Sequence, residues 1–492
     1  MTKTDNKGIT VKKAENFSEW YSQVIQKAKL ADIRVGVQGF LVHRPWGFRI
    51  MRRVYEYLEE EFEKTEHEPM LFPIAVKEES LMKEEEHAGF SPEVFWVTHA
   101  GTRKLEERFA LRPTGETQIY PVYSKWFRSY NELPFKAYQS RHTVFRNEMT
   151  TRPFLRGREF AFFESHNVFS THKECLAQID EDMDILNKVV KDKCKIPFFY
   201  FQRPQWDKFK GADNTFTPDT LMPDGKRNQL ASTHDLGQNF SKAYDIQITD
   251  KKEKQQYAWQ TCFGPGIWRI MAAIIGIHGD DNGLILPFDM APKQIVLIPI
   301  FFKEKAEQNK VSKLLNKTKN DLTKKGYRVI IDDSENSPGF KFNHWELFGV
   351  PLRIEIGPRE LKDNKATIVR RTSRDKTVIN IKDLDKSIEK EAKKLDEDIT
   401  KNAEKYFSDN VRDSNDFKDL KKIMNKNRGF VRVPFCSVDF DGEDCADTLK
   451  AETNGGNVCG TLFPKAEKVG PKEKCIICGK KAHHKVYVAK SY

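Results

Sequence analysis

The sequence predicts an α+β protein with two or three domains, because three stretches of the chain differ in pattern. At 492 residues the chain is too long for one ordinary hydrophobic core. Residues 1–287 mix amphipathic helices with β-rich segments. Residues 288–385 alternate strand and helix patterns, which is typical of a compact α/β domain. Residues 386–492 join a charged helical stretch to a cluster of cysteines, so we expect a small third domain there.

Composition excludes several classes of protein. Hydrophobic residues make up 38% and charged residues 32% of the chain, which predicts a globular fold. No apolar run approaches the roughly 20 residues of a membrane helix, and the polar start at Met1–Lys7 lacks the apolar core of a signal peptide. We therefore expect no membrane partner and a cytoplasmic location. The net charge of +11 favours an anionic partner such as nucleic acid, although a solvated lysine-rich surface would give the same balance.

A helix is predicted before residue 65. Met51, Val54, Leu58 and Phe62 recur at spacings of 3, 4 and 4 residues, which places them on one helical face. A short apolar strand closed by proline follows at 69–73. Such a pair usually serves packing, so this segment alone indicates little about function.

The next segment is rich in arginine. The alternation at 143–148 predicts a strand with Arg146 and Glu148 on one face. A structural ion pair would explain these two, but Arg152, Arg156 and Arg158 flank the following turn, and so many cations require anions nearby. A nucleoside triphosphate supplies them, since guanidinium groups bind phosphates through paired hydrogen bonds.

The third segment, residues 261–269, places two glycines and Arg269 at the entrance to an apolar helix. Glycines permit close approach of the backbone to a ligand, and a helix N-terminus favours anions. Further on, we expect strands at 294–302, 327–331 and 351–356, with a helix carrying apolar residues between the first two. The charged stretch 384–428 predicts one or two solvated helices.

The order of the three early segments resembles the signature motifs of class II aminoacyl-tRNA synthetases, with matches at Pro73, at Arg146 and Glu148, and at Arg269. The closer resemblance is to prolyl-tRNA synthetases of the archaeal and eukaryotic type and covers nearly the whole chain. Segments 111–117, 204–209 and 232–240 are specific to that family. The resemblance implies an antiparallel catalytic sheet with helices, then an α/β anticodon-binding domain, then a small zinc-binding C-terminal domain.

The resemblance also implies a reaction and a set of site residues. L-proline would be ligated to tRNA(Pro) in two steps through prolyl-adenylate, with release of AMP and pyrophosphate, and Arg146, Glu148 and Arg269 would be catalytic. Mg²⁺ would help these arginines to stabilise charge on the phosphates. The family pairs its subunits through the first motif, which implies a homodimer. The residues implied to contact ATP are Arg146, Glu148, Arg156, Gln229, Ser232 and Arg269. Those implied to surround proline are Thr114, Glu116, Arg146, Phe162, Phe209, His234 and Cys262.

In the second domain, charged residues gather around the segment 357–362. They form a site suited to guanine edges and phosphates, although a solvated basic loop would look the same. The predicted anticodon-binding residues are Arg353, Arg359, Glu360 and Lys362.

Four of the eight cysteines have the spacing of metal ligands. Cys436, Cys445, Cys475 and Cys478 read Cys-x8-Cys and Cys-x2-Cys, which predicts a closed structural zinc site. Reduced cysteines without metal, or ligation by His483, His484 or Cys459, are the alternatives. The resemblance agrees with zinc, and it matches Tyr492 to a C-terminal tyrosine that reaches towards the active site.

Two other functions remain open at this point. A class II synthetase for threonine or serine would share the architecture, but residues 114–116 and His234 argue against it. A synthetase-like regulator or RNA-binding factor without catalysis would have lost the arginines and the glutamate of the motifs, and these are present.

Overall fold

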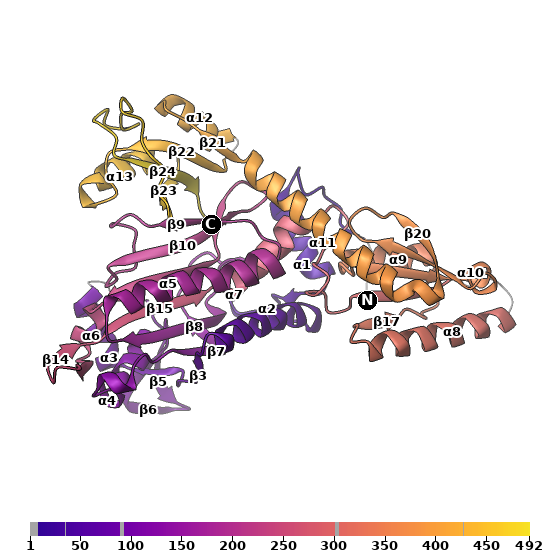
Figure 1. Cartoon of the computed structure of the whole chain (residues 1–492), viewed down its shortest axis with the longest axis horizontal. Helices are drawn as coiled ribbons and strands as arrows, with labels where there is room; N and C mark the ends of the chain where they lie inside the picture. Colours follow the sequence, from indigo (N-terminus) through magenta and orange to yellow (C-terminus); the bar gives the residue numbers. More distant parts are fainter. Residues whose placement is uncertain (1–7, 35, 89–92, 301–304, 427) are drawn as a thin grey trace.

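The computed structural model describes residues 8–34, 36–88, 93–300, 305–426 and 428–492. The polar start at Met1–Lys7 and the end of the strand expected over 294–302 lie outside these ranges. Figure 1 shows the molecule as a broad part built on a large sheet and a narrower part at the other end, joined along one long helix. In the described ranges, no helix combines the length and apolar character of a membrane span.

The broad part is built on one large sheet, which contains twelve strands in the described residues. Most neighbours are antiparallel, as expected for the first domain; the pairs at the two ends are parallel. The order is β21 (Val411–Asp413), β22 (Phe430–Phe435), β24 (His484–Lys490), β23 (Gly456–Leu462), β9 (Phe199–Gln202), β10 (Asn214–Leu221), β12 (Ala231–Gly237), β15 (Trp259–Pro265), β8 (Glu159–Phe169), β7 (Ala137–Phe145) and β3 (Glu68–Pro69), with β11 (Arg227–Gln229) beside β10.

The predicted helix before residue 65 is confirmed as α2 (Pro45–Lys64), and its four periodic apolar residues are buried against the sheet. Burial of each such side chain stabilises the fold by roughly 1.5–3 kcal/mol. The strand expected at 69–73 is shorter, because β3 ends at Pro69 and the Phe72 N–H donates to the Gln139 side chain instead of a strand. Figure 1 shows α5 (His172–Leu186) and α7 (Ile267–Ala273) along the sheet with α2.

Smaller elements complete this part. They are α1 (Phe17–Lys27), β1 (Ala31–Asp32), β2 (Val42–His43), β4 (Ala75–Lys77), α3 (Glu78–Ala88), β5 (Trp96–Ala100), β6 (Arg103–Leu111), α4 (Glu116–Trp126), α6 (Asn239–Ala243), β13 (Gln247–Thr249) and β14 (Gln255–Tyr257). Helices α4 and α6 share a hydrophobic cluster with the sheet residues Val168, Leu236 and Cys262.

The narrower part is the expected α/β domain. Its sheet has the order β17 (Val329–Ile331), β16 (Ile295–Pro299), β18 (Leu352–Ile356), β19 (Lys365–Arg370) and β20 (Lys376–Asn380), parallel over the first three strands and antiparallel afterwards. The helices are α8 (Lys305–Lys324), α9 (Pro338–Leu347), α10 (Pro358–Lys362) and α11 (Leu384–Asp409). The three strands and the helix predicted from the sequence are therefore confirmed, with shorter strand bounds.

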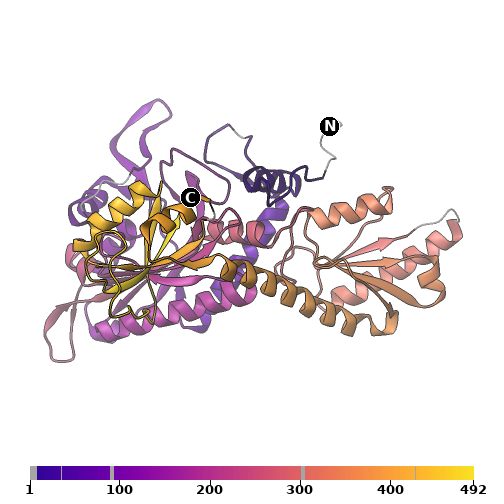
Figure 2. The same ribbon diagram turned by 90° about the horizontal axis from the view of Figure 1, so that it is seen from above.

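The boundary expected between residues 385 and 386 lies inside α11. The first half of this helix buries Leu384, Ile388 and Leu395 in the core of the α/β domain, whereas Phe407 near its end packs against the large sheet. Figure 2 shows α11 running between the two parts. One amphipathic helix thus belongs to two cores, so its sequence has no break that would mark a boundary.

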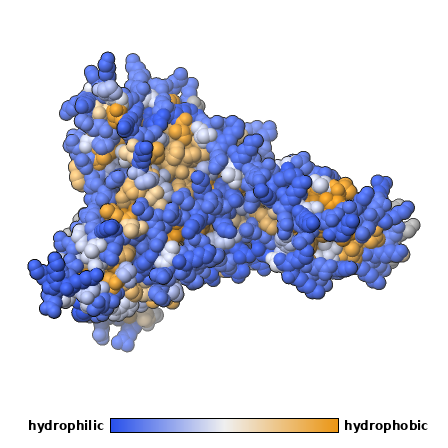
Figure 3. Space-filling view, in the orientation of Figure 1, coloured by the Kyte–Doolittle hydropathy of each residue, from blue (hydrophilic) through white to orange (hydrophobic). Residues whose placement is uncertain are grey.

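The C-terminal residues do not form a separate sheet. The charged stretch contains α11 and α12 (Phe417–Lys426), as predicted, and α13 (Glu443–Glu452) follows. Strand β23 pairs antiparallel with β9 through Thr461 and Leu462, so the C-terminal strands extend the large sheet. The face in Figure 3 is largely hydrophilic with scattered apolar patches, as expected for a chain with 32% charged residues.

Candidate active site

A pocket of about 170 Å³ lies on one face of the large sheet, over β8, β12 and β15. It is lined by all six side chains that the resemblance assigns to ATP: Arg146, Glu148, Arg156, Gln229, Ser232 and Arg269. One local expectation is wrong. Strand β7 ends at Phe145, and the Glu148 N–H donates to the Arg146 carbonyl at 2.9 Å, so this tight turn rather than strand alternation brings both side chains to the pocket.

The pocket is strongly cationic. Arg146, Arg156 and Arg269 line it together, and the carboxylate of Glu148 lies 3.5 Å from Arg156. Among the described residues, neither Arg146 nor Arg269 has an ion-pair partner within 4.0 Å. Burial, followed by the charges of Arg146 and Arg156, lowers the pKa of Arg269 to about 10. Three guanidinium groups around one carboxylate favour a polyanionic ligand.

The third predicted segment shapes the floor of this pocket. Strand β15 carries Gly264, where a Cβ would come within 3.1 Å of the Phe162 ring, so the glycine leaves room for that ring. Helix α7 begins at Ile267 and places Arg269 in its first turn, as expected. The sequence did not identify Trp268 and Phe160, which also line the pocket. The period-2 pattern of β8, which puts Phe160 beside Phe162, is the signal that was available.

A second group of predicted residues meets next to Phe162, deeper on the same face of the sheet. The Thr114 hydroxyl donates to the Glu116 carboxylate, and the Cys262 thiol lies 3.4 Å from Glu116 Oε1. Arg146 is tied to this loop, since its Nε is 3.4 Å from the Pro113 carbonyl. Glu116 is only 2% exposed, so its carboxylate offers a buried acceptor and a negative charge to a cationic ligand.

Aromatic rings adjoin this second group of residues. His234 and Cys262 are cross-strand partners on β12 and β15, and the rings of Phe209 and His234 are 4.6 Å apart. His234 Nδ1 is hydrogen-bonded to Thr215 and its Nε2 to Ser232, at 2.9 and 3.1 Å. Burial, aided by the neighbouring His166, lowers the pKa of His234 to about 3, so the ring is neutral near pH 7.

Behind the Thr114–Glu116 loop lies a buried carboxylate that the sequence analysis missed. Glu164 Oε1 accepts a hydrogen bond from Gln139 at 2.5 Å, and His142 and His166 each lie 3.1 Å from the carboxylate. Burial raises the pKa of Glu164, but the hydrogen bonds from the two histidines outweigh it and hold that pKa well below its usual range. Glu164 and His166 follow Phe162 at spacings of two on β8, so the same strand alternation pointed to them.

The Glu164 carboxylate lies directly against the glycine of the loop. A Cβ on Gly115 would stand 2.5 Å from Glu164 Oε1 and 2.6 Å from Oε2. Only glycine therefore fits between Thr114 and Glu116 while Glu164 keeps its partners. The buried network around Glu164 therefore fixes how closely the loop that carries Glu116 approaches β8.

The four residues expected to bind the anticodon lie on two different elements of the α/β domain. Arg359 and Lys362 lie on the short helix α10, where the Glu360 carboxylate accepts the Gly357 N–H at 3.0 Å and caps the helix. Arg353 lies on β18, where it forms ion pairs with Glu355 and Glu346. The charge of Arg353 is thus balanced by two carboxylates of the chain. Arg359 and Lys362 lie on a different element, the helix α10.

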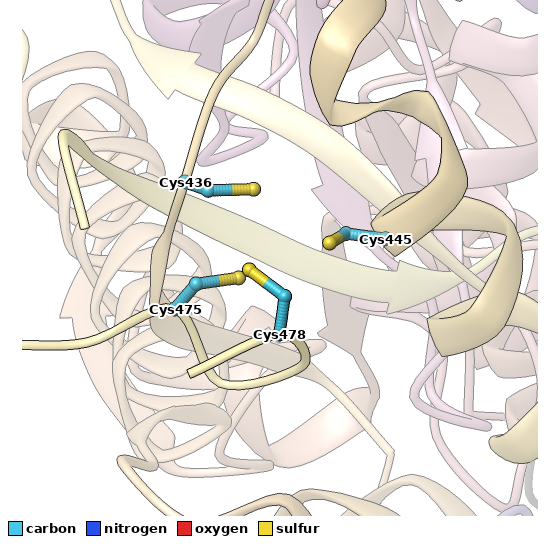
Figure 4. A group of neighbouring side chains, drawn as sticks. All are labelled: Cys436, Cys445, Cys475 and Cys478. Carbon is cyan, nitrogen blue, oxygen red and sulfur yellow. The ribbon is translucent and has the colours of Figure 1, made fainter. Parts of the chain in front are cut away.

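The four cysteines expected to bind metal come together at the end of β22, on α13 and in the turn at 475–478. Their sulfur atoms lie within 4.8 Å of one another, and Figure 4 shows them converging from three segments. All eight cysteines are free thiols. Tetrahedral zinc with bonds of about 2.3 Å requires sulfur atoms about 3.8 Å apart, which this cluster accommodates. Cys459 lies elsewhere, buried on β23 in the core beside Phe201.

The C-terminal residue, Tyr492, packs against residues close to the pocket. The Tyr492 hydroxyl is hydrogen-bonded to Asp224 Oδ1 at 2.5 Å, and the ring lies beneath the cations of Lys226 and Arg152, 4.9 and 5.8 Å from its centre. Arg152 belongs to the segment after β7 from which Arg146 and Arg156 line the pocket.

Three family models match the chain: the class II tRNA synthetase core domain (G, H, P, S and T) over residues 95–278, an anticodon binding domain over 294–391, and the C-terminal domain of prolyl-tRNA synthetase over 417–492. The proline–tRNA ligase of Thermofilum pendens is 48% identical and covers 99% of both chains. That of Methanopyrus kandleri is 38% identical and covers 97% of this chain and 96% of its own.

Solved structures agree with these relatives. Giardia lamblia prolyl-tRNA synthetase in complex with prolyl-adenylate superposes with a TM-score of 0.94, 34% identity and coverage of 99% of this chain and 100% of its own. The prolyl-tRNA synthetase of Cryptosporidium parvum complexed with halofuginone and AMPPNP has a TM-score of 0.92, 32% identity and coverage of 99% of both chains.

Proposed function

The chain belongs to the prolyl-tRNA synthetases within the class II aminoacyl-tRNA synthetases, and on that premise we propose how its residues carry out the reaction. It is a proline–tRNA ligase that uses ATP to join L-proline to tRNA(Pro) in two steps through prolyl-adenylate, releasing pyrophosphate and then AMP. This assignment excludes the alternatives of a synthetase for threonine or serine and of a factor without catalysis.

In the first step, a carboxylate oxygen of proline attacks the α-phosphorus of ATP, and the bond to pyrophosphate breaks. The observation that supports our assignment is the meeting of three guanidinium groups in one pocket beside the loop of Glu116. Arg146 would hold the α-phosphate, Arg269 the γ-phosphate and Arg156 the remaining charge, while Glu148 would accept from the adenine amino group. No residue acts as a covalent nucleophile, so catalysis rests on positioning and on charge stabilisation.

Recognition of proline follows from the chemistry of its ring nitrogen. A secondary ammonium has two N–H donors and one positive charge, and Glu116 with the Thr114 hydroxyl provides a buried anion and a second acceptor. Phe162, Phe209 and the neutral His234 ring would enclose the apolar pyrrolidine, and Cys262 would form the floor.

Magnesium would be held mainly by ATP itself. Mg²⁺ is usually bound through one or two carboxylates plus phosphate oxygens and water, and among the described residues that line the pocket Glu148 is the only carboxylate. The residues present fit a metal that enters with the nucleotide. When bound, it would add positive charge to the phosphates.

In the second step, a terminal ribose hydroxyl of tRNA attacks the adenylate carbonyl, and AMP leaves. The cationic turn at 152–158 borders the pocket and would meet the acceptor end of the tRNA. We assign the anticodon to the α/β domain, with Arg359 and Lys362 of α10 as contacts and Glu360 as the cap that orders them. Arg353, predicted as a fourth contact, would need to leave its two ion pairs to serve this role. Such a reaction serves translation, so we place the protein in the cytoplasm.

The first test is Arg146→Ala in proline-dependent exchange of pyrophosphate into ATP. Loss of one group that stabilises developing phosphate charge costs roughly 10²–10³-fold in rate, so we expect at least about a 100-fold fall in kcat. Arg141→Ala is the matched control, because Arg141 lies on β7, the strand that ends just before Arg146, is exposed and pairs with Glu59 at the surface. Near-normal exchange by the Arg146 variant, with zinc content and fold intact, would refute the assigned role.

We further propose that Cys436, Cys445, Cys475 and Cys478 hold a structural Zn²⁺ ion. Four thiolates at converging positions complete a tetrahedral site, leaving no open position for catalysis. Two backbone bonds, from Cys475 N to Lys480 O at 2.8 Å and from Gly479 N to Cys475 O at 3.0 Å, preform the turn that carries half of the ligands. The ion would stabilise the strands that extend the catalytic sheet.

We also propose a homodimer that covers the apolar surface of the first motif. Large apolar side chains are exposed on β2, on α2 and just after β3, and Leu71 is 79% exposed. Isolated exposed apolar residues are normal, but several along one motif indicate an interface. The members are Val42, Phe48, Leu71 and Ile74.

A further inference from the structure

The β10–β11 hairpin carries Gln229 into the nucleotide pocket, and the C-terminal part of the chain holds this hairpin at its turn. The Gly429 N–H donates to the Gly225 carbonyl at 2.8 Å, and the Tyr492 hydroxyl is bonded to Asp224. Both contacts come from residues beyond α11. The hairpin is therefore fixed from outside the catalytic domain.

A second link runs through the buried side chain of Arg203, which follows β9. Its Nη1 donates to the Cys459 carbonyl of β23 at 2.9 Å. Its Nη2 donates to both oxygens of Asp219, at 3.1 and 2.9 Å, and to Gln229 Oε1 at 3.2 Å. One guanidinium group thus touches the C-terminal strand, a buried carboxylate and a side chain of the ATP pocket.

The chemistry of this contact sets the orientation of the Gln229 amide. A guanidinium group has donors only, whereas a glutamine amide has an acceptor oxygen at one end and an NH₂ donor at the other. Arg203 therefore binds the oxygen and leaves the NH₂ group facing the pocket. A nucleotide is rich in acceptors, namely ring nitrogens and phosphate oxygens, so this orientation is the productive one.

We propose that Arg203 is a positioning residue for ATP: it orients Gln229 and couples that orientation to the docking of the C-terminal strand. This inference rests on the proposed function, since it takes the pocket that Gln229 lines to be the ATP site. Arg203 itself does not line the pocket. Asp219 anchors Arg203 and also accepts a bond from Arg227 at 2.8 Å.

The test is Arg203→Met in the exchange assay and in calorimetric titration with ATP. Asp219 keeps Arg227 as a partner in this variant, so its buried charge stays paired. Loss of an oriented hydrogen bond lowers affinity by about tenfold, and we expect this rise in KM and Kd for ATP with KM for proline unchanged. Gln229→Ala should give a similar rise, and the double variant should add nothing further.

Two more variants separate positioning from a general loss of structure. Arg203→Lys keeps a charge near Asp219 but has one nitrogen for three partners, so it should behave like the methionine variant. Arg432→Met removes a half-buried guanidinium that pairs with Asp413 and Glu467 inside the C-terminal part, and KM for ATP should not change.

Several results would overturn the inference: unchanged KM for ATP in both Arg203 variants or in Gln229→Ala, additive effects in the double variant, or an equal effect of Arg432→Met. These outcomes leave the proposed function standing, because that function depends on Arg146→Ala. Conversely, an active Arg146 variant would remove the proposed role of the arginines. It would not alter the comparison of the Arg203 and Gln229 single variants with their double variant.

Discussion

Gly115→Ala tests whether the buried carboxylate of Glu164 sets the position of the proline-binding loop. The new Cβ would stand 2.5 Å from Glu164 Oε1, whereas ordinary contact begins at 3.4 Å, so one partner must retreat by the difference of 0.9 Å. If Glu164 retreats, its contacts with His142 and His166 at 3.1 Å are broken. Two hydrogen bonds to a charged group are worth about 3–6 kcal/mol together.

The alternative is that the loop moves instead. A displacement near 1 Å at a catalytic or binding group costs about 100-fold in rate, or about 2.7 kcal/mol. Because breaking the buried network would cost about 3–6 kcal/mol of stability, we expect the loop to shift with Glu116. The variant should then lose about 100-fold in kcat/KM for proline while its KM for ATP stays unchanged.

The assay is proline-dependent pyrophosphate exchange with each substrate varied in turn. Gly339→Ala is the matched control, since no atom lies within 4 Å of its added Cβ and the residue is helical. This control should keep normal kinetics. A Gly115→Ala protein with normal kcat/KM for proline would show that Glu164 does not fix the loop, and the reasoning would fail.

Three further outcomes are expected. Elemental analysis should find about one zinc per chain, and Cys478→Ser should lower it, whereas no metal at saturating zinc would remove the site. Leu71→Glu should shift the protein to monomers in sedimentation, while Phe440→Glu, which alters an exposed residue of the C-terminal part, should not; equal behaviour would exclude the proposed interface. His234 has a native pKa of about 3 against 6.5 for the unfolded chain, so protons bind the unfolded state first and stability falls as pH drops. Compared with His234→Gln, the free energy of unfolding of the wild type should decline by about 1.4 kcal/mol more per pH unit between about pH 6 and about pH 4, and identical slopes would contradict a buried neutral imidazole.

The arginines of the nucleotide pocket could be predicted from the sequence. The expected strand, however, ends at Phe145 and does not include Arg146 or Glu148. Their residue types required anions, and the motif order placed them together. Glu164 was missed although it is two residues beyond Phe162 on one face of β8. Its role depends on His142 from β7 and on Gly115 from a loop, and no spacing within one segment reports such a meeting.

The sequence by itself determined the family, the reaction, the helix of the first motif and the cysteine spacing, because each is encoded in the order of a few neighbouring residues. Tertiary structure alone decided that β23 extends the sheet at β9, that α11 serves two cores, and that Arg203 joins Cys459 to Gln229. These features join residues as far apart as Phe201 and Leu462, which are 261 positions apart (462 − 201). Their register is set by packing and by the pairing of buried polar groups, which no local pattern specifies.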